Sequence, residues 1–255
     1  MNDLMPTQSS MRHRTFDSFL LLVALILLWQ GVHELAGSVA ISGPSTTLVQ
    51  TYKLVGDEDF WVNVASTFRA FTLALVLAIG GGLLIGLTLG TNRLLGDAGE
   101  PALMTFYTVP KVSFFPIILL FFGIGLAAEV VFGAIHGIVP VAIFTLNAVR
   151  NIKPVLVKTA RVMRLSRGQL WLTILVPSAI PEIFTGIRIG ISLTFIGTIL
   201  SEMFGSHQGI GFMLMNAIGI NNGDLIMALA VLIMLFAVVV SVSLLALDNR
   251  LHRRI

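Results

Sequence analysis

Long apolar runs occur along this chain, and they limit the folds that it can adopt. The last run, Leu225–Leu247, has no charged side chain, and its only polar residues are Ser241 and Ser243. A helix of about 20 apolar residues crosses the roughly 30 Å hydrocarbon core of a bilayer. Charged residues make up 11% of the chain, compared with about 25% in soluble domains. The chain is therefore predicted to be an all-α membrane protein.

Six apolar runs are long enough to cross a membrane. The predicted spans are Phe19–Ala40, Thr67–Gly90, Ala102–Phe122, Val130–Val149, Ile183–Met203 and Leu225–Leu247. Pro110 and Pro116 interrupt the third span, and Pro140 interrupts the fourth. Neighbouring helices can cover the carbonyl groups that a proline leaves unpaired, so we predict kinked spans rather than broken ones. Short helices are predicted before the second span and over Ile210–Ile218.

The first apolar run has a second interpretation. It follows two arginines and could be a signal peptide, with small residues for cleavage at Ser38-Val39-Ala40. However, Trp29 and Gln30 extend the run beyond the usual length of a signal-peptide core. We therefore predict an uncleaved first span, preceded by a cytoplasmic segment over residues 1–18.

The distribution of positive charge predicts which ends of the spans face the cytoplasm. Lysine and arginine are enriched in cytoplasmic loops, and this bias sets the orientation of a membrane protein. With both termini in the cytoplasm, the outer loops carry only Lys53. The cytoplasmic segments then carry Arg12, Arg14, Arg93, Arg150, Lys153, Lys158, Arg161, Arg164, Arg167, Arg250, Arg253 and Arg254. Topology thus explains the net charge of +3, and no nucleic-acid partner is predicted.

The common motifs of catalysis and nucleotide binding are absent from the sequence. The chain has no cysteine, which excludes a disulfide and a thiolate metal site. The dipeptide Gly-Lys does not occur, so there is no phosphate-binding P-loop. We predict no catalytic residue, metal or cofactor in this chain, and any ATP must bind another chain.

Six lysine and arginine residues lie between positions 150 and 167, between two very apolar stretches. Each would cost about 2.5 to 3.5 kcal/mol at the centre of a membrane helix, so this loop is predicted to lie in the cytoplasm. An amphipathic helix needs a partner for its apolar face, and apolar residues recur at helical spacings within this loop, at Val157, Ala160, Val162, Leu165, Leu170, Leu172 and Ile174. Three interpretations are open: a topogenic cluster packed on its own bundle, a surface for anionic lipid, and a docking element for a soluble partner.

The order of residues in this loop favours the docking element. Residues 149–182 resemble the cytoplasmic loop of permease subunits in ATP-binding-cassette importers, which carries an E-A-A…G…I-x-L-P motif. Lys158-Thr159-Ala160 stands at the E-A-A positions, Arg164 at the glycine, and Ile174-Leu175-Val176-Pro177 at the I-x-L-P spacing. The replacement of glycine by Arg164 leaves the geometry of the turn open, because glycine readily adopts positive φ and arginine rarely does.

Three further segments resemble the nitrate/sulfonate/taurine-type permeases of that family. They are GPST at 43–46, VPKVSFFPIILLFFGIG at 109–125, and PEIFTGIRIGISLTFIGTILSEMFGSHQGIGFM at 181–213. Because these segments occur in the family's order, the resemblance covers most of the chain.

The resemblance implies a type I importer permease fold, with a permease domain over 19–255, core spans within 67–247 and a cytoplasmic coupling loop over 150–182. It also implies two cytoplasmic ATP-binding subunits that hold ATP and Mg, a second permease subunit in a homodimer, and a periplasmic or lipid-anchored solute-binding protein at a bacterial inner membrane. In that family, the helix of this loop docks into the ATPase. The corresponding region here is Ala160–Leu172, and the predicted coupling residues are Lys158, Thr159, Ala160, Arg161, Arg164, Leu165, Ser166, Arg167, Gly168 and Leu170.

Small residues in the spans predict close helix packing. Gly82, Gly86 and Gly90 lie four residues apart on the second span, and Gly186 and Gly190 do so on the fifth. Small residues at this spacing let the backbones of membrane helices approach closely.

Polar residues in the spans predict the wall of a translocation path. Positions 194, 198, 201 and 202 share one face of the fifth span, and ionisable groups at membrane depth are candidates for function. Arg188 is predicted to be structural, and Asn147 is also a candidate for a helix–helix hydrogen bond. The candidate path residues are Lys111, Phe114, Phe115, Asn147, Thr194, Thr198, Ser201, Glu202 and Met203.

Together these features predict the permease subunit of an ATP-driven importer for a small anionic solute, such as a sulfonate, nitrate or an organic carboxylate. The alternatives are a self-sufficient secondary transporter or channel, an importer of the same family for a vitamin precursor, and a membrane-embedded enzyme. A secondary transporter commonly shows inverted repeats and charged midplane sites, and we find no convincing repeat in the sequence.

Overall fold

The computed structural model describes residues 8–37, 41–152 and 154–252, and within these ranges all regular structure is helical. The elements are α1 (Gln8–Ala36), α2 (Pro44–Val55), α3 (Glu58–Thr91), α4 (Arg93–Thr108), the 3-10 turn η1 (Lys111–Phe114), α5 (Phe115–Phe122), α6 (Leu126–Arg150), α7 (Pro154–Val162), α8 (Arg167–Leu170), the π-helical turn η2 (Trp171–Leu175), α9 (Val176–Gly205), α10 (Ile210–Gly219) and α11 (Gly223–His252). The alternative cleavage site at 38–40 lies outside the described residues, as do Lys153, Arg253 and Arg254.

The predicted spans correspond to α1, α3, α4 with α5, α6, α9 and α11. Within the described ranges, four helices are long and apolar enough to cross a membrane, and the α4–α5 pair makes five if it counts as one span. The apolar part of α1 that the structure describes, Leu20–Leu35, is shorter. The all-α membrane fold is therefore confirmed.

The third predicted span is broken rather than kinked. Its two helices, α4 and α5, are bent by 90°. Val109 between them is extended, and Pro110 begins the 3-10 turn. A proline lacks the N–H that a helix needs, and it drives the residue before it out of the helical region. By contrast, Pro140 lies inside a continuous α6, as predicted.

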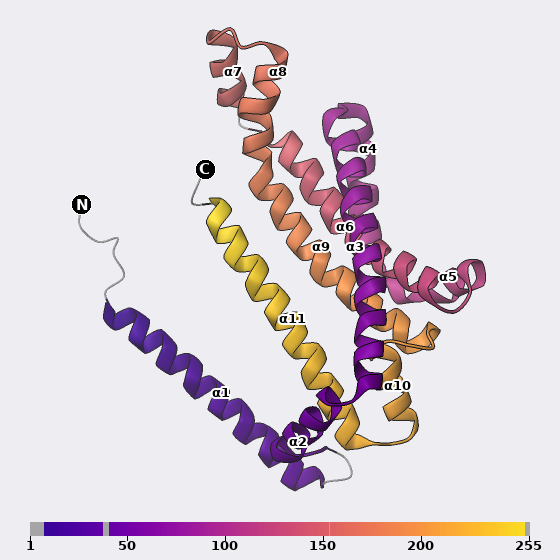
Figure 1. The fold of residues 1–255 in the computed structure, drawn as a ribbon. Coiled ribbons are helices and arrows are strands. Elements are labelled where there is room, and N and C mark those ends of the chain that lie inside the picture. The colour runs from indigo at the N-terminus through magenta and orange to yellow at the C-terminus, as the bar shows by residue number, and fades with distance from the viewer. Residues whose placement is uncertain (1–7, 38–40, 153, 253–255) are drawn as a thin grey trace.

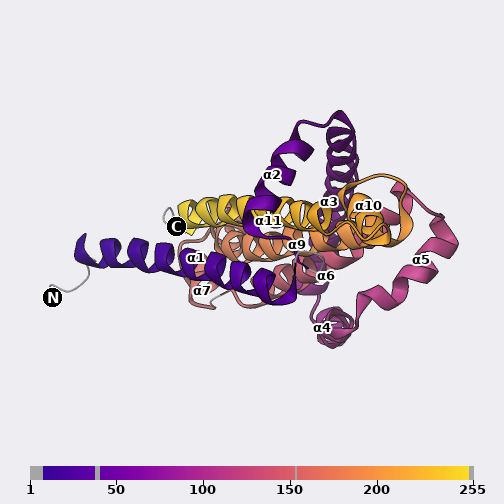
Figure 2. The ribbon, with the colours of Figure 1, turned by 90° about the horizontal axis from the view of Figure 1, so that it is seen from below.

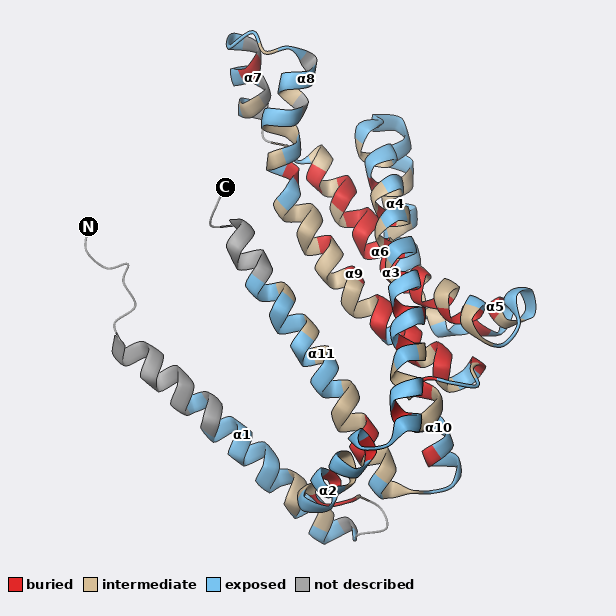
Figure 3. Ribbon diagram, viewed as in Figure 1, coloured by how far each residue is buried: buried red, intermediate tan, exposed pale blue. Residues whose placement is uncertain are grey.

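The fold is organised around α6, which lies between α3 and α9 (Figures 1 and 3). In the most apolar window of α6, 67% of the residues are buried, compared with 11% in that of α11. The exposed helices α5 and α1 lie on opposite sides of the molecule (Figure 2). The core of the protein is therefore a three-helix unit, and the remaining helices present apolar side chains to their surroundings.

Small residues bring α3 into backbone contact with α6. A β-carbon added to Gly82 would lie 2.5 Å from Cβ of Val141. One added to Gly86 would lie 2.5 Å from Cβ of Thr145 and 2.6 Å from the carbonyl oxygen of Ala142. Because such distances leave no room for a side chain, these glycines set how closely the two helices approach.

The register between α3 and α6 is constant along both helices. The contacts pair 82 with 141, 86 with 145 and 90 with 149, which is an offset of 59 residues each time. At the same spacing of four residues, Ala74 and Ala78 of α3 face Gly133 and Gly137 of α6. Every fourth residue of each helix therefore lies on the shared interface.

The two ends of the bundle differ in chemistry. The end that carries the start of α4, the end of α6, α7 and α8 is called the basic end here, and α2 and α10 lie at the opposite end (Figure 1). At the opposite end, Leu54, Phe60, Ala217 and Leu229 form a buried cluster. The structure thus confirms the two short helices that the sequence predicted there, as α2 and α10.

Candidate functional site

The most distinctive feature of the basic end is the segment 154–175, which comprises α7, a turn, α8 and η2. The sequence predicts one docking helix over Ala160–Leu172, but the structure divides this region into two helices at residues 163–166. In Figure 1 the segment projects beyond the ends of α6 and α9. It is therefore a helix–turn–helix that connects two spans.

Arg164 makes this turn with a left-handed backbone. Its φ is +50°, in the region that favours glycine. The backbone N of Leu165 donates to the carbonyl oxygen of Ala160 at 3.1 Å, which is the six-to-one bond of a Schellman motif. Ala160 is buried beneath the turn. The chain thus keeps the turn of a glycine-terminated helix with an arginine in the glycine position.

A capping box begins the next helix. The backbone N of Gln169 donates to Oγ of Ser166 at 3.3 Å, and the backbone N of Ser166 donates to Oε1 of Gln169 at 2.9 Å. This reciprocal pair satisfies donors that a helix start leaves unpaired. From Arg167 the chain is helical without interruption to Gly205, through the π-helical turn at 171–175. Ser166 therefore defines one end of a helix that continues through the membrane-spanning part of α9.

The tip of the segment exposes apolar side chains. Val162 is 83% exposed and Met163 is 65% exposed. The predicted coupling residues Lys158, Thr159, Arg164, Ser166 and Gly168 are exposed, Leu165 and Leu170 are half-buried, and the side chains of Arg161 and Arg167 lie outside the described part. The predicted docking region Ala160–Leu172 includes Val162 and Met163, but neither is among the predicted coupling residues.

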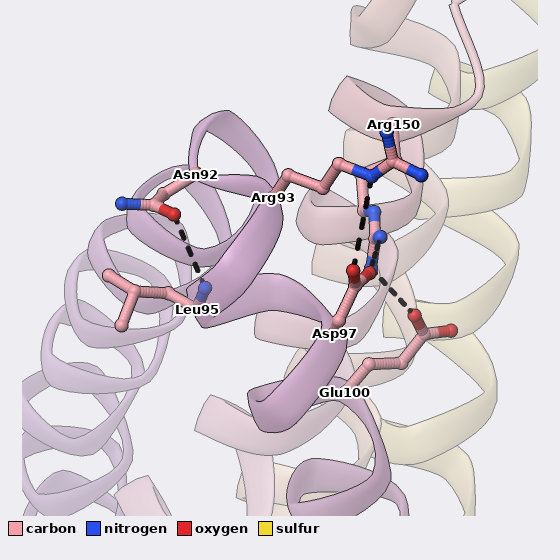
Figure 4. A network of polar contacts seen from close by, with 6 residues as sticks. All are labelled: Asn92, Arg93, Leu95, Asp97, Glu100 and Arg150. Carbon is pink, nitrogen blue, oxygen red and sulfur yellow. Dashed lines mark hydrogen bonds and ion pairs between the residues drawn. The ribbon is translucent and has the colours of Figure 1, made fainter.

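An ionic cluster fixes the base of this segment. Arg150, at the end of α6, pairs with Asp97 and with Glu100, whose Oε2 lies 3.1 Å from Nη1 of Arg150 (Figure 4). Arg93 is 4.0 Å from the same Asp97 and is highly exposed. Asn92 caps the start of α4 by accepting from the backbone N of Leu95 at 3.2 Å. The cluster ties the first turns of α4 to the end of α6, four residues before α7 begins.

The predicted polar face of α9 packs inside the chain. Thr194, Thr198 and Ser201 are fully buried. Oγ1 of Thr198 donates to the carbonyl oxygen of Thr194 at 3.0 Å, and a β-carbon added to Gly133 of α6 would lie 2.7 Å from that hydroxyl. The hydroxyls of Thr194 and Thr198 therefore fit against glycines of α6, and the structure brings this face to a helix interface rather than to an open surface.

Glu202 lies at the opposite end and holds three helices together. The backbone N of Gly211, in the first turn of α10, donates to its Oε2 at 2.8 Å. Oγ1 of Thr67 on α3 donates to the same oxygen at 3.0 Å, and it accepts from the backbone N of Ile210 at 2.9 Å. A carboxylate at the start of a helix also interacts favourably with the helix dipole. This fully buried side chain caps α10 between α3 and α9.

The other predicted path residues lie on different helices. Phe115 is buried against Phe132, with ring centroids 4.9 Å apart, and Phe114 stacks on Phe106 at 5.7 Å. Asn147 is half-buried on α6, and Met203 packs against the cluster formed by Phe71, Phe195 and Ile199. The structure therefore does not gather the nine predicted residues into one cavity.

Lys111 lies at the break between α4 and α5. Its Nζ donates to the carbonyl oxygen of Tyr107 at 3.1 Å and lies 5.2 Å from the centroid of the Tyr107 ring. These contacts hold the ammonium group next to Tyr107.

A pocket of about 370 Å³ lies on the half-buried face of α9. It is lined by Tyr107 of α4, by Arg188, Ile189, Ser192 and Leu193 of α9, and by Ser241 and Leu245 of α11. The sequence predicts a structural role for Arg188. It does not connect this residue to α4 or α11, because no sequence pattern pairs these helices. Among the described residues, no group of three histidine, cysteine, aspartate or glutamate side chains could hold a metal ion.

Comparison with known proteins shows a match over most of the chain. Residues 78–255 match the family described as the binding-protein-dependent transport system inner membrane component. The taurine transport system permease protein TauC of Escherichia coli (strain K12) is 26% identical over 237 residues, which cover 90% of this chain and 86% of TauC. The riboflavin transport system permease protein RibX of Chloroflexus aurantiacus is 31% identical over 214 residues, which cover 83% of this chain and 80% of RibX.

The fold is also similar to that of a solved structure. A chain of the MetNI methionine ABC transporter in an inward-facing conformation aligns with a TM-score of 0.61 and 20% identity, over 75% of this chain and 96% of that chain. At this level of identity the likeness concerns the fold alone.

Proposed function

The chain belongs to the family of binding-protein-dependent transport system inner membrane components, and on that premise we propose how it works. It is a membrane-embedded permease of an ATP-binding-cassette importer for small solutes. We infer that it forms the translocation path and that segment 154–175 couples this path to a separate ATPase.

The exposed tip of the segment supports the docking role. Val162 and Met163 present apolar surface beside the Arg164 turn, and exposed apolar groups beside charged ones are typical of a protein–protein contact. The segment contains several cationic residues, so we expect the groove that receives it to be acidic. The exposed apolar surface of Val162 and Met163 is the observation that carries the proposal.

Helix continuity supports the transmission of movement. The helix that begins at Arg167 continues through η2 into α9, and the row of small residues on α9 packs closely on α6. A displacement of the turn is therefore expected to move α9 as a rigid body, which is a common form of conformational switching. The ionic cluster at Arg150 would carry the same displacement to α4.

The remaining assignments follow from family membership and the charge distribution. We propose that the basic end lies in the cytoplasm of a bacterial cell, with the coupling loop within 150–182 and residues 1–18 before the first span. ATP and Mg would bind two partner ATPase subunits, and a second copy of this chain would complete the path. A periplasmic or lipid-anchored binding protein would deliver the solute to the opposite end.

We propose a small anion as the solute. The relative TauC is named for taurine, which carries a sulfonate, and the pocket on α9 contains a guanidinium group. An importer for a vitamin precursor is the alternative within the same family, since the relative RibX is named for riboflavin.

The test is reconstitution of the permease with the ATPase and the solute-binding protein encoded beside it. The expected result is a stable complex that takes up the solute only when ATP is present, with no uptake by the permease alone. Uptake by the purified permease without any ATPase would instead favour a secondary transporter or channel.

A further inference from the structure

We propose that the pocket between α4, α9 and α11 receives the anionic group of the transported solute, with Arg188 as its counter-charge. This inference rests on the proposed function, because it assigns the solute's transit site within the permease. The proposed site lies on the half-buried face of α9, next to the buried polar face that the sequence predicts as the wall of the path.

The chemistry of the lining fits a small oxyanion. Arg188 contributes a guanidinium, and Tyr107, Ser192 and Ser241 contribute hydroxyl groups. None of the residues that line the pocket is acidic. Guanidinium groups bind carboxylate, phosphate and similar oxyanions through two parallel N–H donors. Hydroxyl groups supply further donors without adding charge.

The position of Arg188 argues for a role beyond packing. It lies twelve residues after the start of α9, within a membrane-spanning segment. A cationic side chain at the centre of a membrane helix costs about 2.5 to 3.5 kcal/mol to insert, and such residues usually face a polar cavity. Arg188 has contacts within the chain, but a guanidinium carries five N–H donors. It can therefore keep those contacts and still present donors to the pocket.

A second cation contacts the same pocket wall. Lys111 is bound to the carbonyl oxygen of Tyr107 and lies over the ring of that residue, and Tyr107 lines the pocket. Lys111 does not itself line the pocket, but the break between α4 and α5 places its positive charge next to Tyr107 of the wall. The volume of about 370 Å³ is near the lower end of the range for small-molecule sites, which suits a small solute.

The absence of cysteine from the chain allows a direct test. The full permease, assembled with its ATPase in phosphatidylcholine nanodiscs, carries either Ser192→Cys in the pocket or Ser178→Cys on the exposed start of α9. Each variant reacts with two methanethiosulfonate reagents, one ending in a sulfonate and one in a trimethylammonium group. Each rate is divided by the rate of that reagent with 2-mercaptoethanol, which removes the difference in intrinsic reactivity.

The expected result is a preference for the sulfonate reagent at Ser192→Cys of on the order of tenfold, from attraction by one nearby cation in a medium of low dielectric constant. Arg188→Gln removes this preference, and Arg188→Lys retains most of it because the charge remains. The rates at Ser178→Cys stay the same in both variants, which shows that each is folded. An unchanged preference in Arg188→Gln would overturn the proposal, as would a pocket cysteine that neither reagent reaches.

Two further arms identify the source of the anion. Protection of Ser192→Cys by millimolar ethanesulfonate, with no protection by phosphatidylglycerol in the nanodisc, supports a solute site. Protection by phosphatidylglycerol alone would mean that the pocket holds a lipid headgroup, and the proposal would be wrong. If the Arg188-dependent preference is present but ATP-driven uptake is absent, the proposed function fails while the pocket assignment stands. If ATP-driven uptake is present but the reagent preference does not depend on Arg188, only the pocket assignment is wrong.

Discussion

The three-helix core and the segment 154–175 are held in place by different means. In the core, rows of small residues bring α3 and α9 into direct contact with the backbone of α6. In the segment, α7 makes its main contact with the turn η2 of the same segment, and its turn is fixed by local hydrogen bonds around Ser166. We therefore expect the core to move as one rigid unit. The segment is attached to this core mainly through its two ends.

The largest effect is expected from adding a methyl group inside the core. Gly86→Ala would place a β-carbon 2.5 Å from Cβ of Thr145, and overpacking of this kind typically costs about 1 to 3 kcal/mol. We expect a marked loss of thermal stability in detergent and of folded yield. Gly80→Ala on the same helix is the matched control, because nothing lies within 4 Å of its added carbon. Equal stability of the two variants would contradict the packing argument.

An effect of comparable size is expected at the cap between α9 and α10. Glu202→Ala leaves the N–H of Gly211 and the hydroxyl of Thr67 without their shared acceptor, and each unpaired buried group costs about 1 to 3 kcal/mol. Glu202→Gln keeps an acceptor oxygen and should lose less. Melting temperatures of the two variants measure the difference. A stability of Glu202→Ala above that of Glu202→Gln would show that the carboxylate is not a cap.

A smaller effect on stability, but a larger one on coupling, is expected at the ionic cluster. Arg150→Glu repels Asp97 and Glu100, yet partly exposed ion pairs contribute only about 0 to 1 kcal/mol. We therefore expect less solute uptake per ATP hydrolysed, with little change in melting temperature. Arg93→Glu is the control, since that side chain is highly exposed and 4.0 Å from Asp97. Partial recovery in Arg150→Glu with Asp97→Arg would demonstrate the pair directly.

The most local effect is expected at the turn of the segment, Arg164. Arg164 has a φ of +50°, and a left-handed conformation costs a residue other than glycine about 1 to 2 kcal/mol. Arg164→Gly should therefore stabilise the turn slightly, and Arg164→Val should destabilise it. Hydrogen exchange of the amides in 163–166 measures this local change. Faster exchange in Arg164→Gly than in the native chain would contradict the backbone assignment.

Much of the fold could be predicted from the sequence because apolar length and glycine spacing are strong signals. The positions of the spans, of α2 and of α10 follow from them. The glycine row and the polar face of α9 were treated as separate features, although positions 186, 190, 194, 198 and 202 form one row with a period of four. The structure packs glycines and hydroxyls of this row on α6, since a small hydroxyl fits close packing nearly as well as glycine.

The features that could not be predicted depend on tertiary contacts. Pro110 and Pro140 look alike in sequence, but Pro140 lies within the largely buried helix α6, whereas Pro110 follows the end of α4. The pocket at Arg188 joins residues of α4, α9 and α11 that are far apart in the chain. Arg164 adopts the left-handed backbone conformation that is typical of glycine. The identity of the residue alone did not predict this.

Crosslinking from the tip of the segment tests the central claim most directly. In the assembled importer, Met163→Cys is the only cysteine of the permease, and Leu120→Cys on exposed α5 is the matched control. A short bifunctional thiol reagent is expected to join the ATPase to Met163→Cys and not to Leu120→Cys. An intact complex in which the ATPase never joins to Met163→Cys would contradict the docking of segment 154–175 on the ATPase.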